Sequence, residues 1–461
     1  MGNTRTSQGG SVHPLVQLLP GSAVDDPDVL AAYRHDRASF CPSGDPAVLV
    51  RARSTEEVSV ALRWASEHRV PVVPQGARTG LSGAANALDG CVLLCLEKMA
   101  EIVEIDVAEQ LAVVRPGVLN GALAAAVAER GLYYPPDPGS MEISTIGGNV
   151  ATNAGGMCCV KYGVTGDFVR GLEVVLADGR VMRTGRRTAK GVAGYDLTSL
   201  FVGSEGTLGV ITEITLALRP AARRPLTAVA FFPSPADACR AVAAYLGEGH
   251  RPSVLEFMDA ETVRAVSALV DLGFPPEVGG VLIVQSDAGA AAEELAAFER
   301  AALDCKADEV VVADDPAEGE LLMRARRLVG PAHEALGTSL VDDVCVPRGR
   351  LADLVDGLDV IAAEHGVRIT CAGHAGDGNM HPSVIFDDTD PAQVAAAQAA
   401  FAAVMDLGLR LGGTITGEHG VGVLKRDWLT RELDDAALWT HRQLKASLDP
   451  LGILNPGRVF A

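Results

Sequence analysis

The sequence predicts an α+β fold with two or three domains. A chain of 461 residues is too long for one hydrophobic core, and its 48% hydrophobic residues are ample for several. The spacing of apolar residues also changes along the chain. Strands and helices alternate up to about residue 220, and the pattern that follows is typical of an antiparallel sheet covered by helices. A Pro- and Arg-rich boundary at 221–225 separates the two parts.

The first part opens with a polar stretch of a dozen residues, which we expect to be disordered, and a helical lead-in to about Arg37. Ser54 and Glu57 have the spacing of a capping box before an amphipathic helix. A Gly-, Pro- and Asn-rich stretch, Pro135–Met157, reads as a loop, and loops of this length inside a domain are usually functional. We expect strands at 70–74, 91–96, 102–106, 111–115, 172–178 and 209–218, and a helix at 119–130.

The second part repeats strand, helix and strand. It begins with a strand at Thr227–Phe232 and a helix capped by Ser234. The segments "SVLEFMD", "GVLIVQSD" and "EVVVAD" predict further strands, and a long helix is expected from Ala288 to Leu303. The tail "LDPLGILNPGRVF" is apolar and rich in turn residues, so we expect it to dock onto the first part.

Charge and cysteine spacing exclude several classes of protein. A net charge of −20 argues against a nucleic-acid partner, which requires clustered Lys and Arg. Nine cysteines without a CxxC pair fit neither a zinc ribbon nor an iron–sulfur cluster and favour a reducing compartment. No apolar run reaches the ~18 residues of a membrane span. We expect a cytoplasmic protein that could rest on a membrane surface, since "MGNTRT" matches an N-myristoylation pattern.

Two Gly-rich loops, 75–86 and 139–156, are candidates for binding a phosphate-containing ligand. Glycine lets backbone N–H groups approach such a ligand closely. Neither loop has the spacing of a Walker loop or of a Rossmann fingerprint, which disfavours a nicotinamide dehydrogenase of that class. The Ser, Thr and Asn donors beside the glycines suit a long ligand with a pyrophosphate, such as FAD. The alternative is that both loops are only tight turns.

Histidines gather in "HAGDGNMH" and "GEHG" although the chain has only ten. The first segment supplies His374 and His381 on either side of a turn, and the second supplies Glu418 and His419. Imidazole and carboxylate are ligands that zinc and similar metals prefer. The residue types therefore propose a site with two histidines and one glutamate. The alternative is that these histidines are hydrogen-bonded turn residues.

Several long motifs resemble a known family. "VPVVPQGARTGLSGAA", "PPDPGSMEISTIGGNVATNAGG", "YGVTGDFVRGLEVVLADGRV" and "LFVGSEGTLGVITEITLAL" are similar to the FAD-binding domain of vanillyl-alcohol-oxidase-type flavoproteins. With "GHAGDGNMH", "TGEHGVG" and "LNPGR" added, residues 40–461 resemble the D-2-hydroxyacid dehydrogenases, which include D-lactate dehydrogenases, the glycolate oxidase flavoprotein subunit and D-2-hydroxyglutarate dehydrogenase.

The resemblance implies a two-part FAD-binding domain and an α+β substrate (cap) domain with an antiparallel sheet. The implied divisions are a lead-in at 1–40, the FAD-binding domain at 41–221, the cap domain with the metal site at 222–430, and a returning segment at 431–461. The first loop lacks the histidine that anchors FAD covalently in some relatives, so we expect noncovalent FAD. The implied FAD-binding residues are Pro74, Gly76, Ala77, Arg78, Thr79, Gly80, Leu81, Ser82, Pro138, Gly139, Ser140, Thr145, Gly148, Asn149, Thr152, Gly155, Glu205, Gly206, Gly209, Ile211 and Asn455.

The same resemblance assigns roles to the histidine segments. Residues matching His374, His381 and Glu418 hold a divalent metal, with zinc favoured and manganese, cobalt and iron as alternatives. Those matching Asn379 and His419 meet the substrate, and His419 would act as general base. The C2 hydride would pass to flavin N5. The alternative for His419 is a residue that only orients a metal ligand.

Arg327 best matches the family's cation for the substrate carboxylate, with Arg326 as the neighbouring alternative. Val341 stands where D-2-hydroxyglutarate dehydrogenases carry a lysine for a second carboxylate. We therefore expect a monocarboxylic substrate such as D-lactate or glycolate.

Several alternatives stay open at this point. They are D-2-hydroxyglutarate oxidation, a same-fold alcohol or aldonolactone oxidase, a metal-dependent hydrolase, and a flavoprotein subunit that needs an iron–sulfur partner. Electrons would leave to a quinone, a cytochrome or an electron-transfer flavoprotein, and a homodimer is compatible with the sequence.

Overall fold

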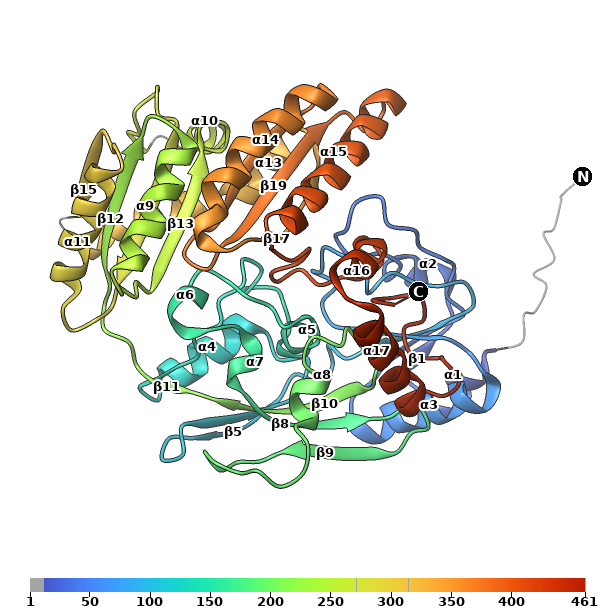
Figure 1. Cartoon of the computed structure of the whole chain (residues 1–461). Coiled ribbons are helices and arrows are strands. Elements are labelled where there is room, and N and C mark those ends of the chain that lie inside the picture. Colours follow the sequence, from blue (N-terminus) through green and yellow to red (C-terminus); the bar gives the residue numbers. More distant parts are fainter. Residues whose placement is uncertain (1–11, 271, 314, 461) are drawn as a thin grey trace, which may run out of the picture.

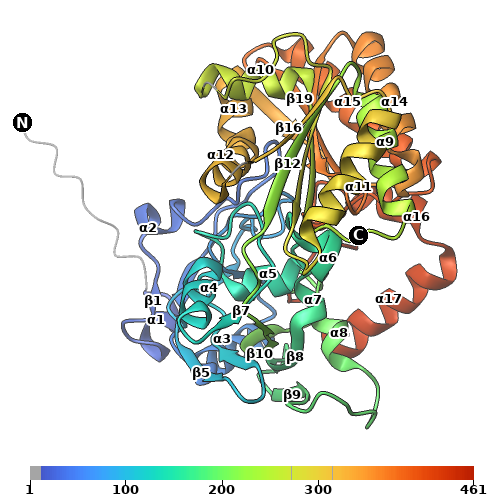
Figure 2. The same cartoon turned by 90° about the vertical axis from the view of Figure 1, so that its left-hand side faces the viewer.

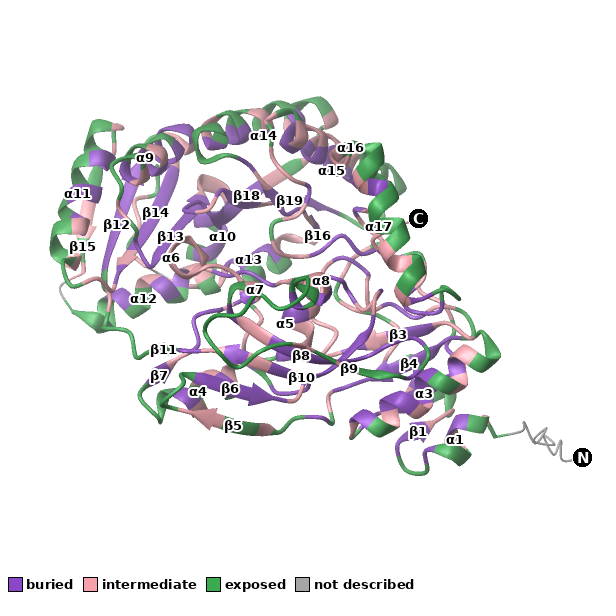
Figure 3. Ribbon diagram, turned by 60° about the horizontal axis from the view of Figure 1, so that its bottom comes forward, coloured by how far each residue is buried: buried purple, intermediate pink, exposed green. Residues whose placement is uncertain are grey.

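Two halves of the molecule lie one above the other in the computed structural model, which describes residues 12–270, 272–313 and 315–460 (Figure 1). The lower half contains the residues before about 220 together with the C-terminal tail, and the upper half contains most of the rest. Buried residues concentrate in the strands of both halves, while the outer helices alternate buried and exposed faces (Figure 3). The predicted α+β class is confirmed. Most of the polar N-terminal stretch lies outside the described residues.

The first sheet of the lower half has four strands, of which three are parallel. Helix α3 (Thr55–His68) lies against it, and the Ser54 hydroxyl accepts the Glu57 N–H as expected. The other half of the predicted capping box differs. The Glu57 carboxylate accepts the Arg53 N–H and the Ser22 hydroxyl, because the incoming chain brings these donors closer. In spatial order the strands are β1 (Ala23–Val24), β2 (Val48–Arg51), β4 (Val92–Cys95) and β3 (Val72–Gln75).

The lead-in is less helical than predicted. It contains two short helices, α1 (Pro14–Leu18) and α2 (Pro27–Ala31), and between them strand β1 pairs with β2. Each helix has a proline at its first position, where the missing N–H costs nothing. The lead-in therefore completes the first sheet.

The second sheet of the lower half has five antiparallel strands. The segment predicted as a loop at Pro135–Met157 contains a helix, α5 (Ile146–Thr152), capped by the Thr145 hydroxyl. Its glycines hid the helix from sequence reasoning, because glycine is unfavourable in helix interiors. The remaining elements are β5 (Ile102–Asp106), β6 (Leu111–Val114), β10 (Val210–Ala217), β8 (Val169–Val175), β9 (Val181–Gly185), the pair β7 (Leu132–Tyr133) and β11 (Arg219–Pro220), and helices α4 (Asn120–Ala128), α6 (Cys159–Tyr162), α7 (Thr165–Phe168) and α8 (Leu197–Phe201).

The upper half, or cap, is one large antiparallel sheet with helices on both faces (Figure 2). Side chains alternate along β12, so that Ala228, Ala230 and Phe232 enter one core and Val229 and Phe231 enter the other. In spatial order the strands are β15 (Glu309–Val312), β12 (Leu226–Phe232), β14 (Gly280–Ser286), β13 (Val254–Asp259), β18 (Arg368–His374), β19 (Asn379–Phe386) and β16 (Thr338–Val341), with β17 (Val344–Cys345) also paired to β19.

Two groups of helices cover the cap sheet. One face carries α9 (Pro235–Gly247), α11 (Ala291–Asp304), α14 (Leu351–His365) and α15 (Pro391–Arg410), and the other carries α10 (Ala260–Leu269), α12 (Pro316–Arg327) and α13 (Val329–Leu336). The short η1 (Arg348–Arg350) precedes α14. By length and composition α15 is apolar enough to cross a bilayer, which the sequence had not suggested. In the structure it packs on the cap sheet through Phe401, Val404 and Met405.

The chain finally returns to the lower half through α16 (Arg426–Glu432) and α17 (Asp435–Leu448). Leu454 forms a parallel bridge to Val72 of the first sheet. Asn455 donates its side-chain N–H groups to the carbonyls of Ala84 and Glu205. The tail thus lies against the first Gly-rich loop, at the junction of the two halves.

Candidate functional site

A cavity of about 1350 Å³ runs between the two halves. A ligand as large as a dinucleotide needs a pocket above the ~300–1,000 Å³ that holds drug-sized molecules. The lower wall consists of the two Gly-rich loops with the strands and turns beside them, and the upper wall consists of the cap. All the predicted FAD-binding residues except Gly155 line this cavity, and so do Arg326, Arg327, His374, His381, Glu418 and His419.

Glycine is required where the lower wall is closely packed. A Cβ on Gly147 would lie 2.5 Å from the Pro116 side chain and 2.9 Å from its carbonyl oxygen, so α5 could not approach that loop. Gly155 has a different role from the predicted one. A Cβ there would lie 2.6 Å from Glu418 Oε2, so this glycine makes room for the cap carboxylate.

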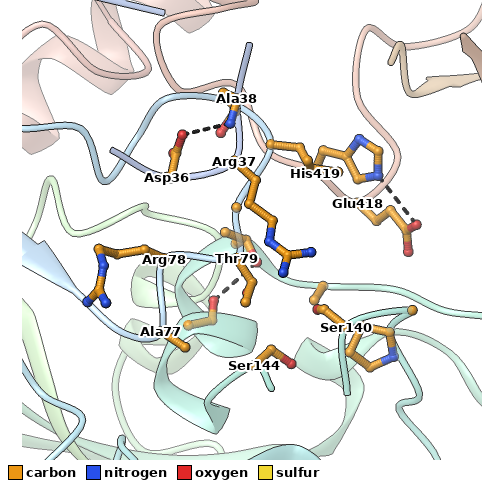
Figure 4. Close-up of a pocket in the computed structure, with 18 of the residues that line it drawn as sticks. Asp36, Arg37, Ala38, Ala77, Arg78, Thr79, Ser140, Ser144, Glu418 and His419 are labelled. Atoms are coloured by element: carbon orange, nitrogen blue, oxygen red, sulfur yellow. Dashed lines mark hydrogen bonds and ion pairs between the residues drawn. The ribbon is translucent and has the colours of Figure 1, made fainter. Parts of the chain in front are cut away.

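The close-up in Figure 4 shows a part of the cavity wall that sequence reasoning missed. Asp36, Arg37, Ala38 and Ser39 belong to the lead-in and line the cavity, and the Arg37 side chain points into it beside Thr79 and Ser140. The Arg37 N–H donates to the Gly80 carbonyl, which fixes the lead-in to the first Gly-rich loop. No motif marks this segment in the sequence.

Three histidines converge on one carboxylate oxygen, Oε1 of Glu418. His374 Nε2 and His381 Nε2 each lie 3.2 Å from Glu418 Oε1, and His419 Nε2 lies 3.8 Å from it. His374 and His381 come from the paired strands β18 and β19, while Glu418 and His419 come from the loop after α15. The rings of His381 and His419 stack with centroids 4.9 Å apart. The structure thus brings all four predicted residues together.

Asp343 organises this loop, and sequence reasoning did not single it out. Its Oδ2 accepts the backbone N–H groups of Gly417, Glu418 and His419 at 3.0, 3.0 and 2.8 Å. Lys425 Nζ lies 3.3 Å from the same oxygen, and both side chains are fully buried. Three backbone N–H donors to one carboxylate oxygen tie the Gly-flanked loop to Asp343.

Burial and neighbouring charges shift the pKa values of His374 and Glu418 in opposite directions. Burial disfavours the charged form of His374, but the carboxylates of Glu256 and Glu418 raise its pKa well above the usual value. Burial likewise acts to raise the pKa of Glu418, but His374 and His381 hold it well below its usual range. Burial lowers the pKa of His419 to about 4, so this imidazole is neutral near pH 7 and can accept a proton.

The residues predicted to contact the substrate differ in their burial and in whether they line the cavity. The Arg326 side chain is only 11% exposed and forms an ion pair with buried Glu256, whereas Arg327 is 46% exposed and pairs with Glu320. Asn379 is buried beside Gly417 and is not among the described residues that line the cavity. Ser383 on the same strand, β19, does line it, as does Val341.

Comparison with known families shows two matches that together span most of the chain. Residues 46–185 match a FAD binding domain, and residues 221–459 match the C-terminal domain of FAD linked oxidases. The p-cresol methylhydroxylase structure is similar with a TM-score of 0.80 and 19% identity, covering 96% of this chain and 95% of that one. A 4-ethylphenol oxidase from Gulosibacter chungangensis gives 0.79 and 18%, with 97% and 95% covered. The lower half therefore has the vanillyl-alcohol-oxidase-type FAD-binding fold.

Sequence relatives of this chain define its class of oxidoreductase more closely than the fold does. The glycolate oxidase subunit GlcD of Bacillus subtilis is 41% identical, over 90% of this chain and 89% of the relative. A D-lactate dehydrogenase of Anaerostipes hadrus is 35% identical, over 96% and 95%. The GlcD subunit of Escherichia coli K12 is 36% identical, over 94% and 85%. The chain belongs to the FAD-linked oxidase family, as an FAD-dependent oxidoreductase of the glycolate oxidase and D-lactate dehydrogenase type.

Proposed function

We propose that the protein uses FAD and a divalent metal, with zinc favoured, to oxidise a monocarboxylic D-2-hydroxy acid such as D-lactate, or the achiral glycolate, to the 2-oxo acid. The observation that carries this proposal is the convergence of His374, His381 and Glu418 on one point of the cavity wall, with neutral His419 beside them. The relatives named for glycolate and D-lactate support the choice of substrate class.

The residues of the cluster suit a metal. Two imidazole nitrogens and one carboxylate oxygen form a donor set typical of a catalytic zinc site, which keeps a position open for substrate. Asp343 Oδ1 and the Nδ1 atoms of His381 and His419 are buried without hydrogen-bond partners among the described residues. Asp343, His381, Glu418 and His419 each offer one ligand atom, and these four atoms lie within 4.8 Å of one another. When bound, the metal would polarise the C2 hydroxyl of the substrate.

The lower wall suits FAD, which when bound accepts the hydride from C2 at flavin N5. Its two Gly-rich loops line the cavity, and loops of this kind suit a ligand with a pyrophosphate. Glu205 and Asn455, which belong to two separate turns, both have positive φ and both line the cavity.

The remaining residues bind the substrate and move its proton. We assign the substrate carboxylate to Arg326, because its guanidinium is buried on the cavity wall beside the cluster, while Arg327 points toward a surface glutamate. His419 Nε2 takes the proton of the C2 hydroxyl as the hydride leaves C2 and the C=O bond forms. No lysine lies among the described residues of the cavity wall, which supports a substrate with one carboxylate.

The test is a visible absorption spectrum of the purified protein during anaerobic addition of D-lactate, L-lactate, glycolate and D-2-hydroxyglutarate in turn. We expect a flavin band that D-lactate or glycolate bleaches and L-lactate does not. Bleaching by D-2-hydroxyglutarate alone would move the proposal to a dicarboxylate substrate. A flavin band that none of the four acids bleaches would contradict it.

Chelation tests the metal separately. Removal of the metal should abolish turnover and leave the flavin bound, because the metal ligands and the FAD wall are different residues. Addition of zinc should restore turnover. Normal turnover by a metal-free sample would refute the metal site and leave the flavin chemistry standing.

A further inference from the structure

Glu256 is a buried carboxylate with two cationic partners from opposite sides of the site. Its side chain is 1% exposed on strand β13. His374 Nδ1 lies 2.9 and 3.0 Å from its two oxygens, and Arg326 Nε lies 2.6 Å from Oε2. One of these partners belongs to the proposed metal site and the other is the proposed anchor of the substrate carboxylate.

The position of Glu256 follows from the register of the cap sheet. Phe257 pairs with Gly373 and Met258 with Ala372 across antiparallel strands β13 and β18. Continuation of this register places Glu256 opposite His374, and side chains opposite one another lie on the same face of the sheet. Val254 and Met258, two residues to either side of Glu256, pack in the core that α12 covers. Arg326, at the end of α12, reaches Glu256 from that side.

Burial of the Glu256 carboxylate costs free energy unless cations surround it. An apolar residue would pack there without this requirement. His374 and Arg326 supply the cations. With the Nδ1–H of His374 donated to the Glu256 carboxylate, Nε2 is the ring atom that faces Glu418 and would bind the metal once its own proton leaves. Arg326 Nε meets Glu256 as an ion pair without hydrogen-bond geometry, and the terminal NH₂ groups of Arg326 are left for a ligand of the cavity.

We propose that Glu256 is a positioning residue that couples the two sites. It fixes the tautomer and ring orientation of His374 and the orientation of the Arg326 guanidinium with one rigid side chain. Glu256 would then set the position of the metal ligand His374 and of the carboxylate anchor Arg326 together. This inference rests on the proposed function, because it assigns Glu256 a role toward that metal and that substrate.

Glu256→Gln keeps the shape of the side chain and removes its charge. A matched control is Glu173→Gln, since Glu173 is also a buried strand carboxylate held by arginines, Arg115 and Arg183, and lies outside the cavity wall. The experiment measures the zinc dissociation constant of flavin-loaded, metal-depleted protein, and then KM and kcat for D-lactate and glycolate at saturating zinc.

We expect Glu256→Gln to weaken zinc binding about 10–100-fold, the usual effect of losing a residue that orients a metal ligand. At saturating zinc, KM should rise more than kcat falls, because the guanidinium loses its orientation. Glu173→Gln should lower the free energy of unfolding and leave both the zinc affinity and KM at wild-type values. A purely structural role for Glu256 would lower stability without moving either quantity.

Two outcomes would overturn the inference. A wild-type protein that binds zinc and oxidises one of these acids, with Glu256→Gln equal to it in both zinc affinity and KM, would remove Glu256 and leave the proposed function intact. A wild-type protein that binds no divalent metal would overturn the proposed function and this role together. Should Glu256→Gln fail to retain flavin, Glu256→Asp carries the same test, because it keeps the charge and shortens the reach to both His374 and Arg326. We expect it to weaken zinc binding and to raise KM, and wild-type values of both would overturn the inference.

Discussion

The two walls of the cavity are built in different ways. Much of the lower wall comes from two Gly-rich loops, each continuous in the sequence. The upper wall presents buried side-chain charges from distant segments, among them Glu256, Arg326, Asp343, His374 and Glu418. Backbone donors are uncharged and need only close approach, whereas buried charges need partners. We therefore expect substitutions that add volume to disturb the lower wall most, and substitutions that remove a charge to disturb the upper wall most.

The two walls meet at the turn after His419. Glu205 of the lower half accepts the N–H groups of Val421 and Gly422 at 2.7 and 2.9 Å, and the Ser82 carbonyl accepts those of Val423 and Leu424. Away from this turn the two walls consist of different residues, so removal of a charge from one wall should leave the ligand of the other wall in place. The following predictions test this separation.

The largest effect is expected from His419→Ala. Loss of the base should lower the rate of flavin reduction by D-lactate or glycolate about 10²–10⁴-fold and leave FAD bound. His365→Ala, at the end of α14 and outside the cavity wall, is the control. Rapid-reaction spectroscopy gives the rate and the absorption spectrum gives the flavin content. Wild-type reduction in His419→Ala would remove this residue from the mechanism.

The second-largest effect is expected in the pH dependence of the free energy of unfolding. Burial raises the pKa of Glu205 to about 7 against an ordinary value of 4.5. The folded protein then binds this proton more tightly than the unfolded chain, so the contribution of Glu205 to stability falls as pH rises from about 4.5 to about 7 and is constant above. At about 1.4 kcal/mol per pKa unit, the loss is on the order of 3 kcal/mol.

Urea unfolding of the FAD-free protein at pH 5 and pH 8 measures this loss. Glu205→Gln should show a smaller decrease between the two pH values than the wild type, because its side chain does not titrate. An equal decrease in both proteins would assign the pH dependence to other groups.

Asp343→Asn should affect the cap wall alone. The amide keeps one acceptor oxygen but loses the charge that binds the N–H groups of Gly417, Glu418 and His419. We expect kcat to fall about 10–100-fold with FAD retained, as for other residues that orient a site. Asp342→Asn is the control, because Asp342 is equally buried but does not accept these donors. Equal kcat values in the two variants would refute the organising role of Asp343.

The smallest effect is expected on the lower wall. In Gly147→Ala the new Cβ would meet Pro116 at 2.5 Å, and overpacking of this kind costs about 1 kcal/mol or more. FAD binding should weaken while zinc binding is unchanged, which calorimetry can measure for both ligands. Gly139→Ala places its Cβ at least 4 Å from any protein atom beyond its two chain neighbours and should leave the stability of the FAD-free protein unaltered. Equal stability in both variants would contradict the close packing of α5.

The sequence predicted more of the lower wall than of the upper one. Loops 75–86 and 139–156 carry recognisable motifs, and their glycines mark close backbone approach wherever they occur. It nevertheless missed helix α5, because two glycines lower the helix propensity that local reasoning detects. It also missed the lead-in residues around Arg37, which reach the cavity only because the first sheet brings them there.

In the upper wall the sequence identified the four residues that carry recognisable spacing, His374, His381, Glu418 and His419. Their supporting carboxylates carry none. Glu256 precedes His374 by 118 residues and Asp343 precedes His419 by 76, so only strand pairing and the folding of the loop create these contacts. Local sequence likewise does not distinguish Arg326 from Arg327 as the carboxylate anchor, because successive residues of one helix point in different directions.

By itself the sequence determined the α+β class, the family and the residue types of the site, because periodicity, glycine-rich loops and short motifs are local properties of the chain. Only the tertiary structure decided which charges are buried, which partners offset them and which side chains face one cavity. The physical reason is that burial and ion pairing depend on distances between segments far apart in the chain, and packing alone sets those distances.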